Sequence, residues 1–287
     1  SAKTSGLAIS MDLNQVVLNE GQILPEYLYR IVPLERFREM LASRRSALVS
    51  PLLWEDPYEV GPLRIELHHP LFRDVDGKMK VGVAFKGEPV RVGNWSLGGE
   101  AIRMVYCQSW TATPESDTMW RAYSTDRNGL RLRVRAASLL TALSTSFPED
   151  SCFLAQVIYV PQTDLDAELL DGPACYRLQV RLCAEDGVHG KGWLPAIRRK
   201  RLEFSAEQEF RLVVVKKCRA PASEWHNLEF FALDPSQLID EVTVDPRTSH
   251  YDKLEAELRA AGYTGSVCRS NLYKAPEYKF WSSNHPR

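Results

Sequence analysis

The chain has 287 residues, of which 44% are hydrophobic and 25% charged, proportions typical of a globular protein that exclude a disordered or collagen-like chain. Its 36 Lys and Arg balance 37 Asp and Glu, and the formal net charge of -1 argues against capture of nucleic acid or an anionic membrane by the whole surface. No apolar run approaches the roughly 20 residues of a membrane-spanning helix, so no membrane partner is expected.

The spacing of the cysteines and histidines excludes the common metal and disulfide patterns. No two cysteines stand two residues apart, and no histidines form an H-E-x-x-H motif, so we predict no metal site and no disulfide framework. Reduced thiols are typical of the cytoplasm, where we expect this protein to reside. The cysteines are Cys107, Cys152, Cys175, Cys183, Cys218 and Cys268.

The first ordered segment is predicted to be a strand followed by a helix. Residues 1–20 show no strong periodicity and are expected to be an N-terminal extension whose first residues are left over from expression; residues 21–287 are expected to form a single α+β domain. Order is expected to begin near Tyr27, because Tyr27–Arg30 is rich in aromatic residues that favour strands. Pro33 suits the first turn of a helix, in which four apolar residues share one face: Leu34, Phe37, Met40 and Leu41.

An insertion is predicted at about 62–99. It follows a short strand at Ala47–Ser50, which ends at Pro51. It contains Asp76–Gly77 between alternating segments, the strongest short-range signal for a β-hairpin. The segment is also rich in glycine, which indicates loops. We therefore expect a glycine-rich hairpin that decorates one edge of the domain.

The middle of the chain is predicted to contain a strand, a helix and a second strand. The first strand covers Ile102–Trp110, and Ser116 or Asp117 then caps a short helix with Trp120 in the core. After a turn at Asn128–Gly129, apolar residues alternate with three arginines that form a one-sided stripe: Arg131, Arg133 and Arg135.

The last third of the chain is predicted to add strands and one amphipathic helix. The helix covers Tyr251–Ala261, with Ala261 facing inward, and Gly262 ends it. The remaining segments favour strands at Phe153–Val160, Gln208–Val215, Glu229–Leu233, Leu238–Val244 and Val267–Tyr273. Together these elements predict one α+β domain with a mixed or antiparallel sheet and flanking helices.

Two acids on one predicted strand are the most informative candidates. Side chains alternate along a strand, so Glu207, Glu209 and Arg211 are expected to share one face. Two carboxylates so close repel each other, which raises the pKa of the more buried one, and an arginine partly offsets this. Such a pair suits stabilisation of an oxocarbenium-like centre during glycosidic cleavage. An exposed polar face of an antiparallel strand produces the same alternation.

Candidate ligand-binding residues stand at the ends of two predicted strands. Arg30, beside Tyr29, offers a guanidinium that can hold phosphate or ribose oxygens, although arginine is also an ordinary surface residue. Ser109 ends a strand and Tyr123 lies on the next helix; together they can contact the sugar and stack on the ring of a nucleotide. Packing in the core is the alternative role for Tyr123.

Two basic features and one turn have simpler interpretations. The run Arg198–Arg201 and the stripe that begins at Arg131 can each meet phosphates, but most such features are solvated faces. Asp56 precedes a proline and is expected to shape a turn through its carboxylate.

Five short motifs in chain order resemble a large bacterial family, the domain of unknown function 2971. They are an aromatic strand at Tyr27–Arg30, an Asp-Pro turn at Glu55–Glu59, a strand end at Cys107–Ser109 with Met119–Tyr123 and Gly129–Leu132 after it, a Glu-x-Glu-aromatic-Arg motif at Glu207–Arg211, and a closing Arg-Ser element at Arg269–Tyr273. These motifs span most of the chain. Glu55 stands where the family has asparagine, and the segment 62–99 is longer than expected.

The order of these candidates is also similar to that of ADP-ribosyltransferases. The resemblance implies a split sheet of that type, NAD as co-substrate and no metal. It implies that Arg30 anchors NAD and that Tyr123 stacks on nicotinamide. It further implies that Glu209 hydrogen-bonds the nicotinamide ribose while Glu207 orients the acceptor. The expected NAD-binding residues are therefore Arg30, Tyr29, Ser109, Tyr123 and Arg211.

The leading hypothesis is accordingly an enzyme that transfers ADP-ribose from NAD to a protein, a nucleic acid or water. Bacterial enzymes of this type often serve as toxins or in phage defence. The first alternative is a non-catalytic module of the same fold that senses a nucleotide or binds a partner protein. The second is a metal-dependent nuclease built on Asp56, Glu207 and Glu209, although the usual following lysine is missing.

Overall fold

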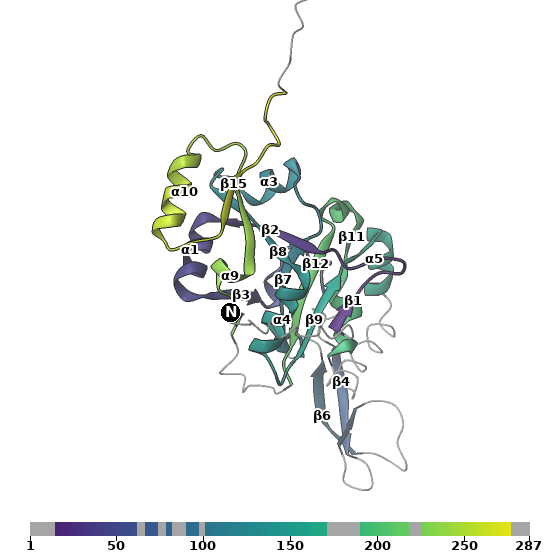
Figure 1. Cartoon of the computed structure of the whole chain (residues 1–287). Coiled ribbons are helices and arrows are strands. Elements are labelled where there is room, and N and C mark those ends of the chain that lie inside the picture. Colours follow the sequence, from purple (N-terminus) through teal and green to yellow (C-terminus); the bar gives the residue numbers. More distant parts are fainter. Residues whose placement is uncertain are drawn as a thin grey trace, which may run out of the picture.

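The computed structural model describes residues 15–61, 67–73, 79–81, 90–97, 101–170, 190–217 and 226–276, without the side chains of 67–97. These residues form a mixed α+β fold around one large sheet (Figure 1). In spatial order its main path runs through β1 (Val16–Val17), β9 (Ser151–Gln156), β12 (Glu209–Val215), β7 (Val105–Thr111), β2 (Tyr27–Pro33), β8 (Gly129–Arg135), β14 (Ile239–Val244) and β15 (Ser266–Arg269). Neighbouring strands are antiparallel except at the two ends of this path, where each terminal strand runs parallel to its neighbour.

The sheet divides at β7. On one side β7 pairs with β12 along its whole length. On the other side it meets two different strands. Tyr29 of β2 pairs with Thr111, whereas Val49 of β3 (Arg45–Val49) pairs with Cys107. β13 (Leu228–Ala232) then pairs with β3 and extends this branch. Because β2 and β3 leave from opposite ends of β7, the two branches diverge over the middle of that strand.

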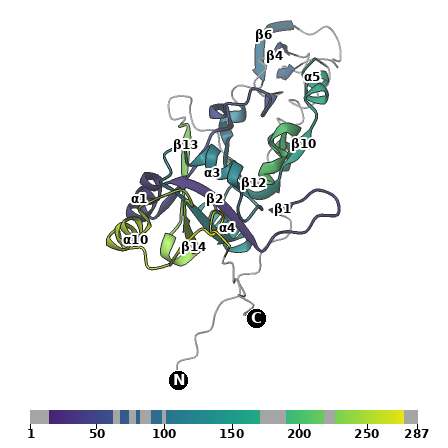
Figure 2. The ribbon, with the colours of Figure 1, turned by 90° about the horizontal axis from the view of Figure 1, so that it is seen from above.

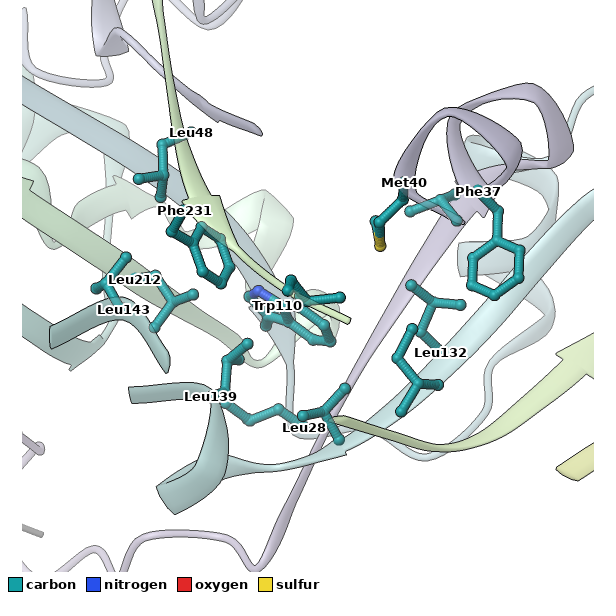
Figure 3. Packing of buried hydrophobic residues seen from close by; sticks show 14 of the residues in the cluster. Leu28, Phe37, Met40, Leu48, Trp110, Leu132, Leu139, Leu143, Leu212 and Phe231 are labelled. Carbon is teal, nitrogen blue, oxygen red and sulfur yellow. The ribbon is translucent and has the colours of Figure 1, made fainter. Parts of the chain in front are cut away.

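Helices cover one face of the sheet. They are α1 (Leu34–Ser43), α4 (Ala136–Ser146) and α10 (Tyr251–Ala260), and α1 and α10 lie side by side in Figures 1 and 2. The ring of Phe37 in α1 meets Tyr263, just after α10, edge to face at 5.3 Å between centroids. Figure 3 shows Trp110 of β7 among Leu28 and Leu139 in this larger core.

A second, smaller core packs on the opposite face of the same strands. Val213 and Val215 of β12 point into it, together with Cys107 of β7. Its covering elements are short: the 3-10 helices η2 (Pro51–Leu53), η3 (Ala101–Met104) and η4 (Lys191–Trp193), and the helix α8 (Leu194–Ile197). Since both faces of β12 are covered, all of its residues are buried.

Other elements lie beside or beyond the large sheet. β10 (Ile158–Val160) and β11 (Arg199–Arg201) form a separate parallel pair. β4 (Leu67–Arg73), β5 (Met79–Val81) and β6 (Val90–Leu97) form an antiparallel sheet that projects from the body in Figures 1 and 2. β4 pairs with β5 across residues 74–78; the expected Asp76–Gly77 turn lies outside the described residues. The remaining elements are α3 (Asp117–Tyr123), α5 (Gln162–Leu170), α9 (Pro235–Leu238) and η5 (Leu202–Glu207).

The α+β class, the mixed sheet and the flanking helices are confirmed. The short helix α3 begins where expected, because the side chain of Ser116 accepts a hydrogen bond from the Met119 amide, and Trp120 is fully buried. Order begins well before Tyr27, since Val16 and Val17 pair with β9. The prediction that Ala261 faces inward is wrong, because it is exposed just after the helix ends. Among the described helices, none is long and apolar enough to cross a membrane.

Candidate functional site

The predicted acidic strand is buried rather than exposed. The side chains of Glu209 and Arg211 are only 3% and 1% accessible, so the interpretation of an exposed polar face is wrong. The cause is tertiary: β12 lies between β7 and β9, and the second core covers the face that carries these two charges. Buried charges are costly unless they are paired and hydrogen-bonded, so their partners decide what they can do.

Glu209 is surrounded by donors. The Ser109 hydroxyl and Arg211 Nε donate to Oε1, the latter at 2.8 Å, and Lys200 Nζ donates to Oε2 at 2.9 Å. Burial alone would raise the pKa of Glu209, but Arg211, followed by Lys200 and Ser109, outweighs it and lowers the pKa to about 2. Glu209 is therefore a carboxylate throughout the physiological range.

Glu207 reaches the same place from a different element. It is the last residue of η5 rather than part of the strand, and Gln208 after it adopts a left-handed conformation with φ 43°. The turn still directs the Glu207 carboxylate toward Glu209's partners: Oε2 accepts from Lys200 Nζ at 2.6 Å and Oε1 from the Tyr123 hydroxyl at 3.1 Å. A non-glycine residue with positive φ beside a buried acid is a local strain of the kind found at functional sites.

Two buried residues that the sequence analysis did not single out complete this cluster. Lys200 lies on β11, and its Nζ is 3.4 Å from a Glu59 oxygen as well as near the two acids above. Burial would lower the pKa of Lys200, but the surrounding acids, Glu209 foremost, raise it above its ordinary value. Burial raises the pKa of Glu59, although Arg211 lies 2.9 Å away and opposes this.

The Arg211 guanidinium contacts other groups of the chain. Its guanidinium donates to Glu59, to Glu209 and to the Ile197 carbonyl, and it stacks on the Trp54 ring at 4.1 Å. It does not line the cleft described next. Arg211 was expected to contact a cofactor; these hydrogen-bond partners all belong to the chain itself.

A cleft of about 180 Å³ opens where the sheet divides, over the middle of β7. Its floor and walls come from β2, β3, β7, α3 and the start of β12. Apolar walls are supplied by residues such as Val49, Trp54 and Met119. The cleft brings together six of the seven predicted site residues: Arg30, Tyr29, Ser109, Tyr123, Glu207 and Glu209.

Arg30 is a cation that the cleft leaves unpaired. Its backbone pairs with Leu132 in β8, but within the described part of the chain its half-buried guanidinium makes no hydrogen bond or ion pair. Burial lowers the pKa of Arg30 to about 10, while the nearby Tyr123 hydroxyl raises it slightly. Arg30 is therefore charged at neutral pH and has all its donors available to an anion.

The aromatic residues of the cleft differ in availability. Tyr123 is 46% exposed, and burial of its hydroxyl, reinforced by Glu207, raises its pKa above its usual range. It is a neutral phenol with an exposed ring, fitted to stack on a flat heterocycle. Tyr29 is half-buried, and the Arg131 guanidinium lies 5.3 Å from its ring centre.

The side chains of the two basic features are bound to partners within the chain. In the stripe, Arg131 and Arg133 share Glu241 at 3.1 and 3.3 Å, and Arg135 pairs with Glu26 at 2.6 Å. The members of the basic run likewise bind groups of the chain itself: Arg198 binds Asn19, Arg199 binds Glu168, Lys200 binds the buried acids and Arg201 binds Asp56. Neither feature is a free phosphate-binding surface.

Asp56 has the structural role expected of it. Its carboxylate accepts from the Tyr58 amide at 3.0 Å and from Arg201 Nε at 3.1 Å. The acids of the nuclease hypothesis are thus each bound to a cation of the chain, Asp56 to Arg201, and Glu207 and Glu209 to Lys200. Within the described residues no three His, Cys, Asp or Glu side chains form a group that could hold a metal.

Comparison with known proteins yields only distant likenesses. No family model matches the chain, and no curated protein matches its sequence. Structures of Thermus sp. 2.9 DarT, in complexes with NAD+, carba-NAD+ and ADP-ribosylated ssDNA, are similar at TM-scores of 0.34, 0.35 and 0.34 and identities of 11%, 10% and 11%. The matches cover 86%, 87% and 86% of this chain and 96%, 97% and 94% of those chains. At these values the likeness shows neither membership of a family nor a ligand.

Proposed function

We propose that this cleft binds NAD and that the protein breaks the bond between nicotinamide and ribose, passing ADP-ribose to an acceptor. One observation carries the proposal: an unpaired arginine, an exposed tyrosine ring and an ionised, buried glutamate line the same cleft. These are the three groups that a dinucleotide with a scissile glycosidic bond needs, and they come from β2, α3 and β12.

Each group fits one part of the substrate. Arg30 offers paired N–H donors to a pyrophosphate, and the Tyr123 ring offers a face to the nicotinamide. Small-molecule sites are concave, and this cleft is lined by apolar and polar side chains together. Apolar walls around a few polar groups are also typical of such sites.

The chemistry follows from the charge on Glu209. When the glycosidic bond breaks, both bonding electrons leave with nicotinamide, which becomes neutral, and positive charge develops on the ribose. A carboxylate with a pKa of about 2 is ionised at neutral pH and stabilises that charge in a site shielded from water. The acceptor then forms a bond to the anomeric carbon and loses a proton, which Glu207, the second carboxylate that lines the cleft, can accept.

The acceptor is a protein side chain, a nucleic acid or water. The solved DarT complexes contain NAD+ or ADP-ribosylated ssDNA. In this chain the basic run is already paired, so it lends no support to a nucleic-acid acceptor. A transferase of this kind acting on a macromolecule fits a role as a toxin or in phage defence.

A specific observation favours a second candidate, a nucleotide-binding module without turnover. A carboxylate has about four acceptor positions. Those of Glu209 are filled by Ser109, by Lys200 and by two donors of Arg211. A ribose hydroxyl can reach the carboxylate only by replacing a donor, and Ser109 is the exposed one. Without that exchange, the cleft binds the nucleotide and leaves it intact.

Incubation with NAD labelled in both halves separates the two candidates. The expected result is release of nicotinamide, with the ADP-ribose label in a protein, nucleic-acid or free fraction of the added lysate. Glu209→Gln is expected to lower the rate at least 100-fold, while Glu203→Gln, an exposed acid of η5, leaves it unchanged. Binding without release in the unaltered protein supports the module; neither binding nor release refutes both.

A further inference from the structure

The paired strands β10 and β11 deliver two side chains to one backbone position of the site. Their register places Tyr159 opposite Lys200, and partners in a parallel pair present their side chains on the same face. The Tyr159 hydroxyl accepts the Glu209 backbone N–H at 2.8 Å, and Lys200 Nζ donates to the Glu209 carboxylate at 2.9 Å. The strand pair thus contacts both the main chain and the side chain of the same residue.

Glu209 needs such support because it begins a strand. Its partner on β7 is Thr111, but the pairing of β12 with β9 starts only at Phe210. The residue before it, Gln208, is in the left-handed conformation and lies outside the strand. On the β9 side the main chain of Glu209 is therefore held by Tyr159 and by the Val157 amide, which donates to the Glu209 carbonyl at 2.9 Å. Strand ends without a partner open readily.

We propose that Tyr159 and Lys200 are positioning residues, which fix Glu209 so that its carboxylate faces the cleft. This rests on the proposed function insofar as the carboxylate acts on NAD. Tyr159 holds the main chain of Glu209, and Lys200 holds its carboxylate. Lys200 Nζ also lies 2.6 Å from Glu207 Oε2 and so links the two acids. Neither residue is required to touch the substrate, and Lys200 does not line the cleft.

Several charged groups surround Glu209, and Lys200 is one of the two cations that pair with it. Besides Lys200, the titratable and charged groups that influence the pKa of Glu209 or are influenced by it come from several elements: Arg211, Glu59, Tyr123, Tyr159 and Cys107. Glu207 shares Lys200 with Glu209. Of these groups, Arg211 is the other cation, 2.8 Å from the carboxylate. Loss of Lys200 therefore leaves Glu209 with one cation and two neighbouring acids, so its pKa must rise and its orientation loosen.

The first test measures the charge of Glu209 directly. In protein labelled with 13C at glutamate carboxyls, the Glu209 signal, assigned by its loss in Glu209→Gln, is titrated in the original protein and in Lys200→Met. The titration midpoint is expected to rise by about 1–3 pH units in Lys200→Met. The control is Lys216→Met, which removes a lysine paired with Asp150 at 2.9 Å outside the cleft. An unchanged midpoint overturns the role of Lys200.

The second test separates orientation from charge. Tyr159→Phe removes one hydroxyl and changes no charge at neutral pH, because burial raises the pKa of Tyr159 to about 12. We expect the kcat for nicotinamide release to fall at least tenfold with KM little changed, whereas Tyr251→Phe, whose hydroxyl donates to the Val267 carbonyl at 3.1 Å, leaves both unchanged. An unaltered kcat overturns the role of Tyr159.

The outcomes distinguish this proposal from the proposed function. If the original protein releases no nicotinamide, the proposed function fails, yet the carboxyl titration still decides whether Lys200 controls Glu209. If Lys200→Met does not fold, Lys200→Arg keeps the charge with another shape: a normal Glu209 midpoint with a reduced kcat supports positioning, and a normal kcat overturns it. For Tyr159, the hydrogen-exchange rate of the Glu209 backbone amide is then measured instead of kcat. An exchange rate that Tyr159→Phe leaves unchanged contradicts the proposal.

Discussion

At the scale of single residues, the site combines a carboxylate whose hydrogen-bond positions are filled with an arginine that has no partner among the described residues. Glu209 has every acceptor position occupied, whereas Arg30 has no partner among the described residues. Selection for stability alone disfavours a half-buried cation without a partner, because an uncompensated charge costs free energy. An anionic group of a ligand is the partner that compensates the Arg30 charge. The contrast therefore assigns Arg30 to ligand binding and Glu209 to the chemical step.

Replacing Arg30 should reduce ligand binding without harming the fold. Because Arg30→Gln breaks no internal ion pair and removes an uncompensated charge, we expect the free energy of unfolding to stay the same or to rise. Affinity for NAD should fall at least tenfold through loss of a charge-assisted contact. Urea unfolding and calorimetric titration measure the two effects. Arg36→Gln, on the exposed face of α1, is the control, and equal affinity in both variants would contradict the role of Arg30.

The acid side of the stability profile should report on Glu209. Its pKa is about 2 in the folded protein against an ordinary 4.5, so its ionised form stabilises the fold above about pH 4.5 and this contribution is lost as the pH falls toward 2. In Glu209→Gln the slope of unfolding free energy against pH in that window should be shallower by as much as about 1.4 kcal/mol per pH unit. Urea melts from pH 6 to pH 3 measure it; parallel curves for Glu209→Gln and the original protein would refute the low pKa.

At the scale of elements, the turn from α3 into β8 determines where Tyr123 lies. Ser124 follows the helix, and its buried hydroxyl accepts from the Gly129 amide at 2.9 Å. A Cβ at Gly129 would lie 2.5 Å from the Ser124 Cβ, so the contact between helix end and strand leaves room only for glycine. The end of α3, and with it the ring that lines the cleft, is thereby fixed against β8.

Gly129→Ala should therefore affect both stability and binding. We expect a loss of about 1–3 kcal/mol from overpacking and a weaker affinity for NAD, because Tyr123 must move with Ser124. Gly262→Ala is the matched control: it lies in open space, and its positive φ of 90° costs stability but touches no part of the cleft. Equal NAD affinity in the two variants, measured at matched folded fractions, would show that α3 does not position the ring.

The sequence predicted the elements better than it predicted their contacts. Strand-favouring aromatic residues located β2, the spacing of apolar residues located α1, a capping residue located α3 and alternation located β8, because these signals are local. The helix α4 was not foreseen, since its eight Ala, Ser and Thr residues give a weak apolar stripe. Lys200 was hidden in a basic run: β11 has only three residues, and which of them is buried depends on its pairing with β10. Burial of Glu209 was equally invisible, because it depends on the strands either side.

At the scale of the whole molecule, the divided sheet creates the cleft. The β2 and β3 branches diverge from β7, and the acids are delivered from the strand on its other side. The two cores pack on opposite faces of β7 and β12, which hold the floor rigid. The cleft is therefore built into the sheet and present before a ligand arrives, so little conformational free energy is lost on binding.

A preformed cleft should make NAD a stabiliser of the entire fold. At a concentration one hundred times its Kd, a ligand of the folded state adds about 2.7 kcal/mol, which corresponds to roughly 4–5 °C in Tm for a protein of this size. Differential scanning fluorimetry measures the shift. Adenosine, which lacks the pyrophosphate, should give a smaller one. Equal shifts with NAD and adenosine would contradict recognition of phosphate at Arg30.

The most direct measurement is a crystal structure with an NAD analogue whose glycosidic bond resists cleavage. The account predicts that the pyrophosphate lies against Arg30, that the nicotinamide stacks on Tyr123, and that a ribose hydroxyl is within about 2.6–3.2 Å of a Glu209 oxygen, in place of Ser109. An analogue bound elsewhere, or bound in the cleft with its ribose away from Glu209, would contradict it.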